Sequence, residues 1–204
     1  MRAIDFNSQR DNYDFGGQIV GNVQCFSTCA WMFMAYYAPA IDARDDKGLC
    51  RYVDDVETSV GEAGSAEAMM REDRRMRDLV ARGTKSMFFW AIHRHAIEGF
   101  LHREGVRGRC VFCETMTLDD VDSVLEDGPV IMGTTALGGL KGGHVILLIS
   151  KARHKNAYYV NDPYGDARTR YRQHDGCGVL YARKRIERHG TRHGRVCRCM
   201  FWQF

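Results

Sequence analysis

The stretch Cys25–Tyr37, Cys-Phe-Ser-Thr-Cys-Ala-Trp-Met-Phe-Met-Ala-Tyr-Tyr, decides the fold that this sequence predicts. After the first turn almost every side chain is apolar, which is typical of a helix buried on every side. Pro39 lies two residues beyond the stretch and ends such a helix, because a proline ring cannot continue the backbone hydrogen bonding. Cys25 therefore stands at the first turn of a buried helix, where the helix dipole favours a thiolate, and we take it as a candidate nucleophile.

Two further candidate residues lie where predicted strands begin and end. His144 follows the glycine-rich stretch 137–143 and opens a short apolar run that is typical of a buried strand. Residues 157–161 predict the neighbouring strand, and Asp162 comes directly after it, in a turn that Pro163 favours. If the two strands pair, the carboxylate reaches the imidazole. A thiol, an imidazole and a carboxylate are together the groups needed for nucleophilic attack on a carbonyl.

Four short motifs, taken in order, resemble those of a known family. They are Ser-Gln-Arg-Asp-Asn at 8–12, Cys-Phe-Ser-Thr at 25–28, Gly-His-Val at 143–145 and Asn-Asp-Pro-Tyr-Gly at 161–165. The set resembles the papain-like cysteine peptidases of the bacteriocin-leader-processing type, and most closely their phage and bacterial lytic branch. Each motif is short, so the resemblance depends on their shared order over roughly residues 8 to 182.

The resemblance implies a role for each of the three candidates. Cys25 becomes the nucleophile, His144 the general base, and Asp162 the residue that orients the imidazole. The implied fold is α+β and papain-like, in which an N-terminal helix bearing the nucleophile packs on a C-terminal antiparallel sheet. The implied activity is hydrolysis of peptide bonds by a cysteine peptidase.

A glutamine upstream of the cysteine donates a hydrogen bond to the oxyanion in the same family. Gln9 occupies that place in the first motif. Gln18 and Gln24 also precede the cysteine, so the choice among these three glutamines stays open.

Three more residues are expected to contact the substrate. Gly142 and Gly143 precede the candidate base, and the missing side chains would let a substrate backbone come close. Tyr164, in the Asn-Asp-Pro-Tyr-Gly turn, is expected to line the same cleft between the helical half and the sheet half.

Length and composition predict one domain over residues 1–204. A chain of 204 residues with 45% hydrophobic and 27% charged residues can bury a substantial core and is ordinary for a globular protein. We expect a helical insertion region over 40–105, with helices at 66–82 and 86–105, and a further helix capped by Thr117. The expected strands are 129–135, 144–151, 157–162 and 178–183. Residues 183–204 are expected to form a basic C-terminal extension.

The eight cysteines are expected to be reduced, because no secretory signal accompanies them. Cys29 lies one helical turn after the candidate nucleophile and is expected to be a structural residue. Cys110-x-x-Cys113 and Cys197-x-Cys199 could offer four thiolates to zinc, but the hydrophobic residues between the first pair are unlike a zinc knuckle. We therefore expect no metal and no cofactor, with zinc at these pairs as the open alternative.

Positive charge is concentrated in the last quarter of the sequence. Residues 151–204 hold 13 Lys or Arg and 4 Asp or Glu, a net charge of +9, whereas the whole chain has +3. Such a surface suits an anionic partner such as a cell-wall polymer, and no zinc-finger or phosphate-loop motif points to nucleic acid. The N-terminus lacks a secretory-signal pattern, and no apolar stretch is long enough to span a membrane.

These observations leave three functions open. The first is hydrolysis of peptides in bacterial peptidoglycan by a phage lysin or a virion-associated enzyme. Such an enzyme would be made in the host cytoplasm and act at the cell wall. Other virion proteins would be its further partners, and we expect it to bind neither a membrane nor nucleic acid. The second is a peptidase that processes proteins or leader peptides. The third is a non-enzymatic virion structural module of the same fold.

Overall fold

A computed structural model describes residues 4–10, 25–49, 51–52, 85–192 and 196–204, and every structural statement below concerns these residues. The helices include α1 (Cys25–Tyr37), α5 (Lys85–Arg103), α6 (Leu118–Val124) and α7 (Arg183–Gly190), with 3-10 turns η2 (Leu137–Gly139) and η3 (Ala167–Thr169). The strands are β1 (Arg109–Met116), β2 (Val130–Thr135), β3 (Gly143–Lys151), β4 (Ala157–Asn161), β5 (Val179–Ala182), β6 (Thr191–Arg192) and β7 (Val196–Gln203).

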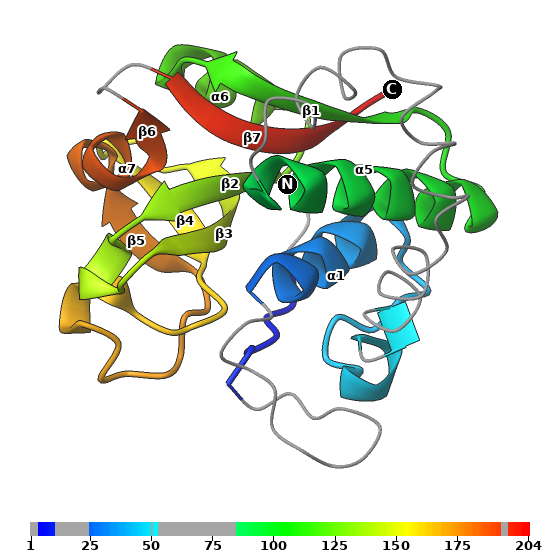
Figure 1. Ribbon diagram of the computed structural model, residues 1–204, viewed down its shortest axis with the longest axis horizontal. Helices are drawn as coiled ribbons and strands as arrows, with labels where there is room; N and C mark the ends of the chain where they lie inside the picture. The colour runs from blue at the N-terminus through cyan, green and yellow to red at the C-terminus, as the bar shows by residue number, and fades with distance from the viewer. Residues whose placement is uncertain (1–3, 11–24, 50, 53–84, 193–195) are drawn as a thin grey trace.

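The seven strands of the described residues form one antiparallel sheet (Figure 1). The order across the sheet is β1-β7-β2-β3-β4-β5, and the short β6 pairs with β7. Strands β3 and β4 are neighbours, with Leu147 opposite Asn161. Because antiparallel neighbours run in opposite directions, the start of β3 and the end of β4 lie at the same end of the strand pair.

Helices cover both faces of this sheet. On β3, Val145 and Leu147 belong to the core cluster that includes residues of α1 and α5. Ile146 and Leu148 belong instead to the cluster that includes residues of α6 and α7. Successive side chains of a strand point to opposite faces, so a strand buried on both faces needs the continuous apolar run that this sequence has.

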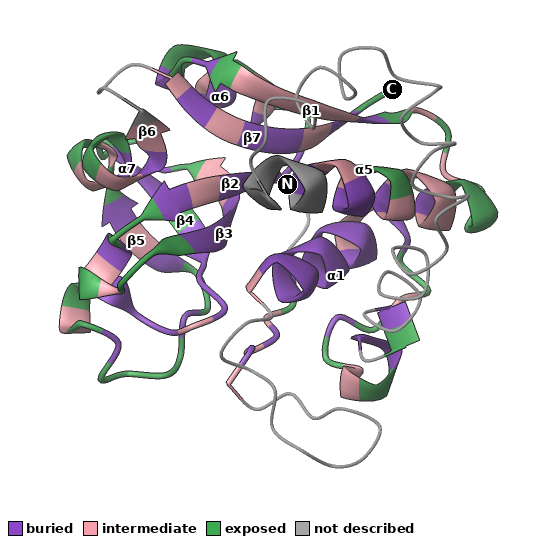
Figure 2. Ribbon diagram, in the orientation of Figure 1, coloured by how far each residue is buried: buried purple, intermediate pink, exposed green. Residues whose placement is uncertain are grey.

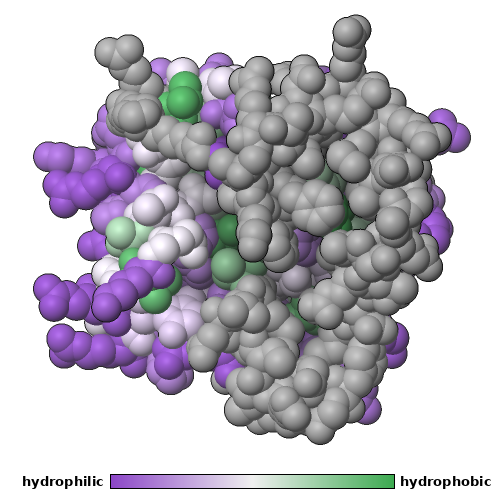
Figure 3. All heavy atoms as spheres, viewed as in Figure 1, coloured by the Kyte–Doolittle hydropathy of each residue, from purple (hydrophilic) through white to green (hydrophobic). Residues whose placement is uncertain are grey.

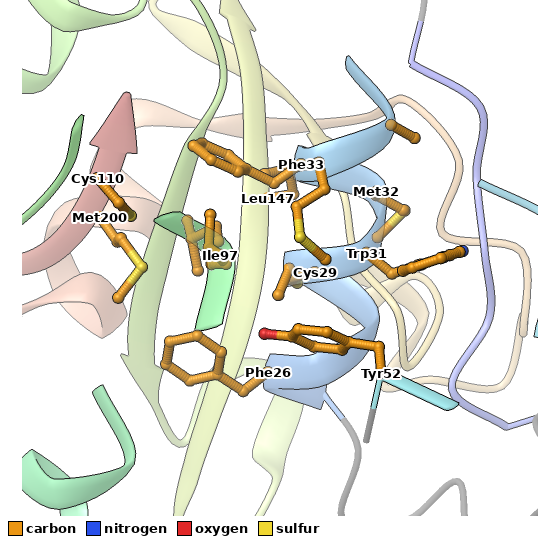
Figure 4. Packing of buried hydrophobic residues seen from close by; sticks show 14 of the residues in the cluster. Phe26, Cys29, Trp31, Met32, Phe33, Tyr52, Ile97, Cys110, Leu147 and Met200 are labelled. Carbon is orange, nitrogen blue, oxygen red and sulfur yellow. The ribbon is translucent and has the colours of Figure 1, made fainter. Parts of the chain in front are cut away.

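Helix α1 is the centre of the first of these clusters. Its residues 26–35 are all buried (Figure 2), and the helix ends at Tyr37, two residues before Pro39. Figure 4 shows side chains of α1 gathered with Leu147 of β3 and Met200 of β7. The expected α+β architecture, in which a helix that begins at Cys25 packs on an antiparallel sheet, is confirmed.

Four of the strands lie within one residue of the predicted bounds, namely β2, β3, β4 and β5. The sequence does not predict β1 or β7, so the sheet is larger than expected and begins before α6. Strand β7 pairs with β1 on one side and β2 on the other. Residues 183–204, predicted as a basic extension, therefore supply α7 and an interior strand of the sheet rather than an appendage.

Part of the predicted helical insertion at 40–105 falls outside the described residues, including the whole of the predicted helix at 66–82. The helix predicted at 86–105 is confirmed as α5, which packs against α1 and β1. Thr117 caps α6 as predicted, in a reciprocal pair of hydrogen bonds with Asp120. Of the helices described here, none combines the length and the apolar character needed to cross a membrane.

Candidate active site

The three candidate residues meet where α1 begins and where β3 and β4 approach each other. Cys25 is the first residue of α1, His144 the second of β3, and Asp162 follows the last residue of β4. The Nε2 atom of His144 lies 2.7 Å from Oδ1 of Asp162. The side chain of Cys25 is a further hydrogen-bond partner of the imidazole, so Nδ1 is the nitrogen left to face the thiol. The pairing of β3 with β4 is what brings residues 144 and 162 together.

The imidazole of His144 is held in a setting that favours its protonated form. Burial, with only 3% of the residue exposed, acts to lower the pKa, but the carboxylate of Asp162 acts in the opposite direction, with a smaller contribution from Cys25. The attraction outweighs the burial, and the pKa of His144 rises to about 10. A strongly basic imidazole can take the proton of the neighbouring thiol and leave a thiolate beside an imidazolium.

Asp162 is completely buried, and its carboxylate accepts four hydrogen bonds. Oδ1 accepts from His144 and from the backbone N–H of Tyr164 at 3.1 Å. Oδ2 accepts from the hydroxyls of Tyr181 at 2.8 Å and Tyr171 at 3.3 Å. Burial, followed by the charge of Asp162, raises the pKa of both tyrosines, so that they remain donors. The sequence did not identify these two tyrosines.

A close backbone contact fixes the position of the Asp162 main chain. Its N–H donates to the carbonyl of Gly176 at 3.0 Å. A Cβ on Gly176 would lie 1.9 Å from the carbonyl oxygen of Asp162, a distance at which the two atoms would overlap. Glycine is therefore required at 176 for this loop to close over the end of β4.

Aromatic rings support the other side of the imidazole. Tyr164 and Tyr171 meet the His144 ring edge-on, with centroids 6.2 and 6.0 Å away. The guanidinium of Arg10 lies 4.7 Å above the ring of Tyr164. Tyr164 thus helps to hold the imidazole. It does not line the cavity beside the thiol, so its expected contact with substrate stays a prediction.

Gln9 is brought to the turn that carries Asp162. It is buried, and its backbone N–H donates to the carbonyl of Pro163 at 2.9 Å. Gln18 and Gln24, the other two candidates for the oxyanion donor, lie outside the described residues. The role of Gln9 as donor stays a prediction that its anchored position supports.

A cavity of about 360 Å³ opens beside the thiol. It is lined by Cys25, Trp90, Gly133, Thr134, Thr135, Gly143, His144, Val145, His189, Gly190, Thr191 and Arg198. Gly143 is among these lining residues, and its expected contact with the substrate stays a prediction. Gly142, with a φ of 107°, precedes the strand and does not line the cavity. His189, Thr191 and Arg198 come from α7, β6 and β7 and were not identified from the sequence.

Cys29 differs sharply from Cys25. It is fully buried, and its thiol donates to the carbonyl of Val145 at 3.5 Å. Burial, reinforced by the nearby Cys25 and Asp162, raises the pKa of the Cys29 thiol well above its ordinary value. A neutral, buried thiol is a poor nucleophile, which fits the structural role expected for it.

Replacing Cys29 with alanine is expected to leave hydrolysis close to that of the wild type. The change removes one buried sulfur and should cost only about 1 kcal/mol of the free energy of unfolding. Urea denaturation and an assay of turnover on the same preparation measure both effects. Loss of turnover with stability retained would transfer the nucleophile from Cys25 to Cys29.

The four cysteines considered for zinc lie on the adjacent strands β1 and β7. Cys113 is opposite Cys199, and the thiol of Cys197 donates to the carbonyl of Met116 at 3.0 Å. Cys110 lies in the core with α1, where burial raises the pKa of its thiol. Across the ranges that the structure describes, no three His, Cys, Asp or Glu side chains gather as metal ligands do.

Elemental analysis of the purified protein is expected to find no stoichiometric zinc. The thiol of Cys110 points into an apolar cluster, and a metal site needs its ligands deprotonated and converging on one point. One zinc per chain, lost together with the fold on adding a chelator, would contradict this expectation.

Comparisons with known proteins add little to this geometry. No protein-family model matches the chain, and no curated protein matches it. One solved structure, of a Bacillus anthracis protein described as a C39-like peptidase, is similar at 14% identity with a TM-score of 0.39. The alignment covers 55% of this chain and 58% of that one, so the chain spans less than two thirds of the structure that it matches.

Proposed function

We propose that this protein is a cysteine peptidase that cleaves peptide bonds in bacterial peptidoglycan. The observation that carries the proposal is the connected set Cys25, His144 and Asp162, with the thiol at a helix N-terminus and at the edge of a cavity. Side chains with these three roles recur in peptidases on unrelated folds, where geometry rather than sequence position identifies them.

In the proposed reaction, His144 takes the proton of the Cys25 thiol, and the thiolate attacks the carbonyl carbon of the peptide bond. The carbonyl oxygen becomes an oxyanion, which the backbone N–H of Cys25 and the side chain of Gln9 are proposed to stabilise. As the C–N bond breaks, the imidazolium gives its proton to the leaving amine. A water molecule, deprotonated by His144, then attacks the thioester and releases the acid and the free thiol.

The choice of peptidoglycan as substrate has two supports besides the site. The ordered motifs resemble the lytic branch of the family, and residues 151–204 carry a net charge of +9 that suits an anionic wall. Synthesis in a host cytoplasm and delivery to the wall, with the enzyme carried in a virion beside other virion proteins, belong to the same proposal.

The test is incubation of the purified protein with insoluble bacterial cell walls, followed by mass spectrometry of the released fragments. The proposal predicts new amino groups and no new reducing sugar ends, because the bond cleaved is a peptide bond. If walls yield no amino ends while a protein or leader peptide is cut, the processing-peptidase alternative replaces the proposal. If nothing is cut and Cys25 is unreactive, the structural-module alternative does.

A further inference from the structure

A second cavity, of about 840 Å³, lies next to the catalytic one. It is lined by Ala136, Gly138, Gly139, Ala167, Arg168, Arg170, Lys184, Arg185, Arg188 and His189. His189 lines both cavities and is held by a hydrogen bond between its Nδ1 and the carbonyl of Thr135 at 3.1 Å. A ligand that extends from the thiol past His189 therefore enters the second cavity, which we name the basic cavity.

Most of the charge around the basic cavity has no acidic counterpart. Arg168 pairs with Asp166 at 2.7 Å. Burial acts to raise the pKa of Asp166, but the hydrogen bonds and charge of Arg168, with the charge of Arg185, outweigh it and lower that pKa. Of the side chains in the part of the chain that the structure describes, none forms an ion pair with Arg170, Lys184 or Arg188. Figure 3 shows hydrophilic side chains gathered on the side of the molecule where α7 lies in Figure 1.

Part of this charge opposes the stability of α7, although the helix dipole favours Arg188 in the last turn. Lys184 and Arg188 are four residues apart, so they lie on one face of the helix, where like charges repel. Lys184 and Arg185, which both line the basic cavity, also occupy the first turn, where the helix dipole favours acidic residues. An anionic ligand in the basic cavity would offset both effects.

One wall of the basic cavity is bare backbone. Gly138 has a φ of 61°, and a Cβ there would lie 2.4 Å from the ring of Tyr171, the residue that also holds Asp162. Gly139 has a φ of 90°, and nothing lies within 4 Å of where its Cβ would be. The turn η2 therefore packs against Tyr171, which holds Asp162, and its bare backbone at Gly139 leaves room for a ligand in the basic cavity.

We propose that the basic cavity is a specificity subsite for carboxylate groups of the substrate peptide, on the side of the scissile bond that faces α7. This inference rests on the proposed peptidase function. Arginine guanidinium groups bind carboxylates in a bidentate manner, and a cleft lined by charges of one sign concentrates ions of the opposite sign. The carboxylates can belong to an acidic protein segment or to the stem peptides of a cell wall, because the recognised chemistry is the same.

The first test uses the reactivity of Cys25 and needs no substrate. Iodoacetate is anionic and iodoacetamide is neutral, so the ratio of their alkylation rates at Cys25 reports the potential next to the thiol. The double variant K184E/R188E should lower this ratio about tenfold at low ionic strength, and about 1 M salt should remove the difference, since the screening length is then about 3 Å. Peptide mapping by mass spectrometry assigns the alkylated cysteine.

The matched control is R153E/K155E, which makes the same change of charge on exposed residues of the turn between β3 and β4. Its rate ratio should stay within about twofold of the wild type. An equal ratio in the wild type and in K184E/R188E would overturn the proposed subsite. A slow reaction of Cys25 with both reagents would instead count against the peptidase function, so the two failures are distinguishable.

The second test measures ligand binding directly. Labelled octaglutamate should bind the wild type and R153E/K155E about tenfold more tightly than K184E/R188E, and octaglutamine should show no such difference. Stem peptides prepared from cell walls, with their carboxylates free or amidated, form a parallel arm. If the wild type prefers the acidic form only in the octaglutamate arm, the substrate is an acidic protein. If it prefers the acidic form only among the stem peptides, the substrate is a cell wall. Equal binding of the acidic and neutral forms in both arms would overturn the proposal.

Discussion

Cys25→Ala is expected to abolish hydrolysis, with a fall in turnover of roughly 10⁶-fold, the scale seen when a catalytic nucleophile is removed. The thiol is the group that forms the bond to the substrate, and Cys25 is the cysteine that hydrogen-bonds to His144. Because Cys25 is only half-buried at the start of α1, its loss should leave the fold intact. Circular dichroism and thermal unfolding check the fold, and product release from cell walls checks turnover.

The variant Cys25→Ala should still bind those walls without dissolving them, because the charges of residues 151–204 are unchanged. Cys29→Ala serves as the matched control, since it removes a thiol from the next turn of the same helix. Wild-type turnover in Cys25→Ala would remove the nucleophile from the proposed mechanism.

Asp162→Asn is expected to lower turnover by roughly three to four orders of magnitude with little change in substrate binding. The hydroxyls of Tyr171 and Tyr181 donate to this side chain, so they favour the asparagine orientation that keeps its oxygen toward them. The amide NH₂ then faces His144 Nε2, which must accept and leave its proton on Nδ1. Nδ1 faces Cys25, and a protonated nitrogen cannot take the thiol proton.

Asp122→Asn is the control for this change. Its carboxylate also accepts from a tyrosine hydroxyl, that of Tyr158 at 2.7 Å, but it lies among Lys151 and Arg183 rather than beside the imidazole. This variant should lose stability and keep its turnover number. If Asp162→Asn and Asp122→Asn had equal turnover, Asp162 would be a structural residue.

Comparison of the wild type with Asp162→Asn also tests the pKa of the imidazole. The pKa of His144 in the folded protein is about 10, above the ordinary value of about 6.5 in an unfolded chain. Its attraction to Asp162 therefore stabilises the wild type fully below about pH 6.5 and is lost as the pH rises through about 10. The difference in free energy of unfolding between the wild type and Asp162→Asn should shrink over this interval. A difference independent of pH would contradict the raised pKa.

Much of the catalytic centre could be predicted because local sequence sets it. An apolar run stopped by Pro39 defines α1 and so the place of Cys25. The apolar runs of β3 and β4 define the places of His144 and Asp162. These residues lie at the ends of elements, where sequence patterns change most clearly.

The surroundings of the centre could not be predicted in the same way, because long-range contacts set them. Tyr181 donates to a carboxylate 19 residues away, and its position within β5 gives no sign of that partner. Arg198 lines the catalytic cavity only because β7 lies next to β2, and its charge also obscured the strand pattern of 196–203. The basic residues of α7 were counted as part of a charged surface, but only the fold shows that they border one cavity.

The interior position of β7 has a consequence for how the molecule assembles. Strand β1 and strands β2 to β5 are made earlier. Among the described strands, β1 shares no direct pairing with β2 to β5, and β7 joins the two parts. During synthesis the sheet therefore stays in two parts, with an unpaired edge on each, until residues 196–203 have emerged. Contacts so far apart in sequence form slowly, and exposed edges invite aggregation. Closure of the sheet consequently depends on one strand, and completion of the core that supports Cys25 waits until β7 has been made.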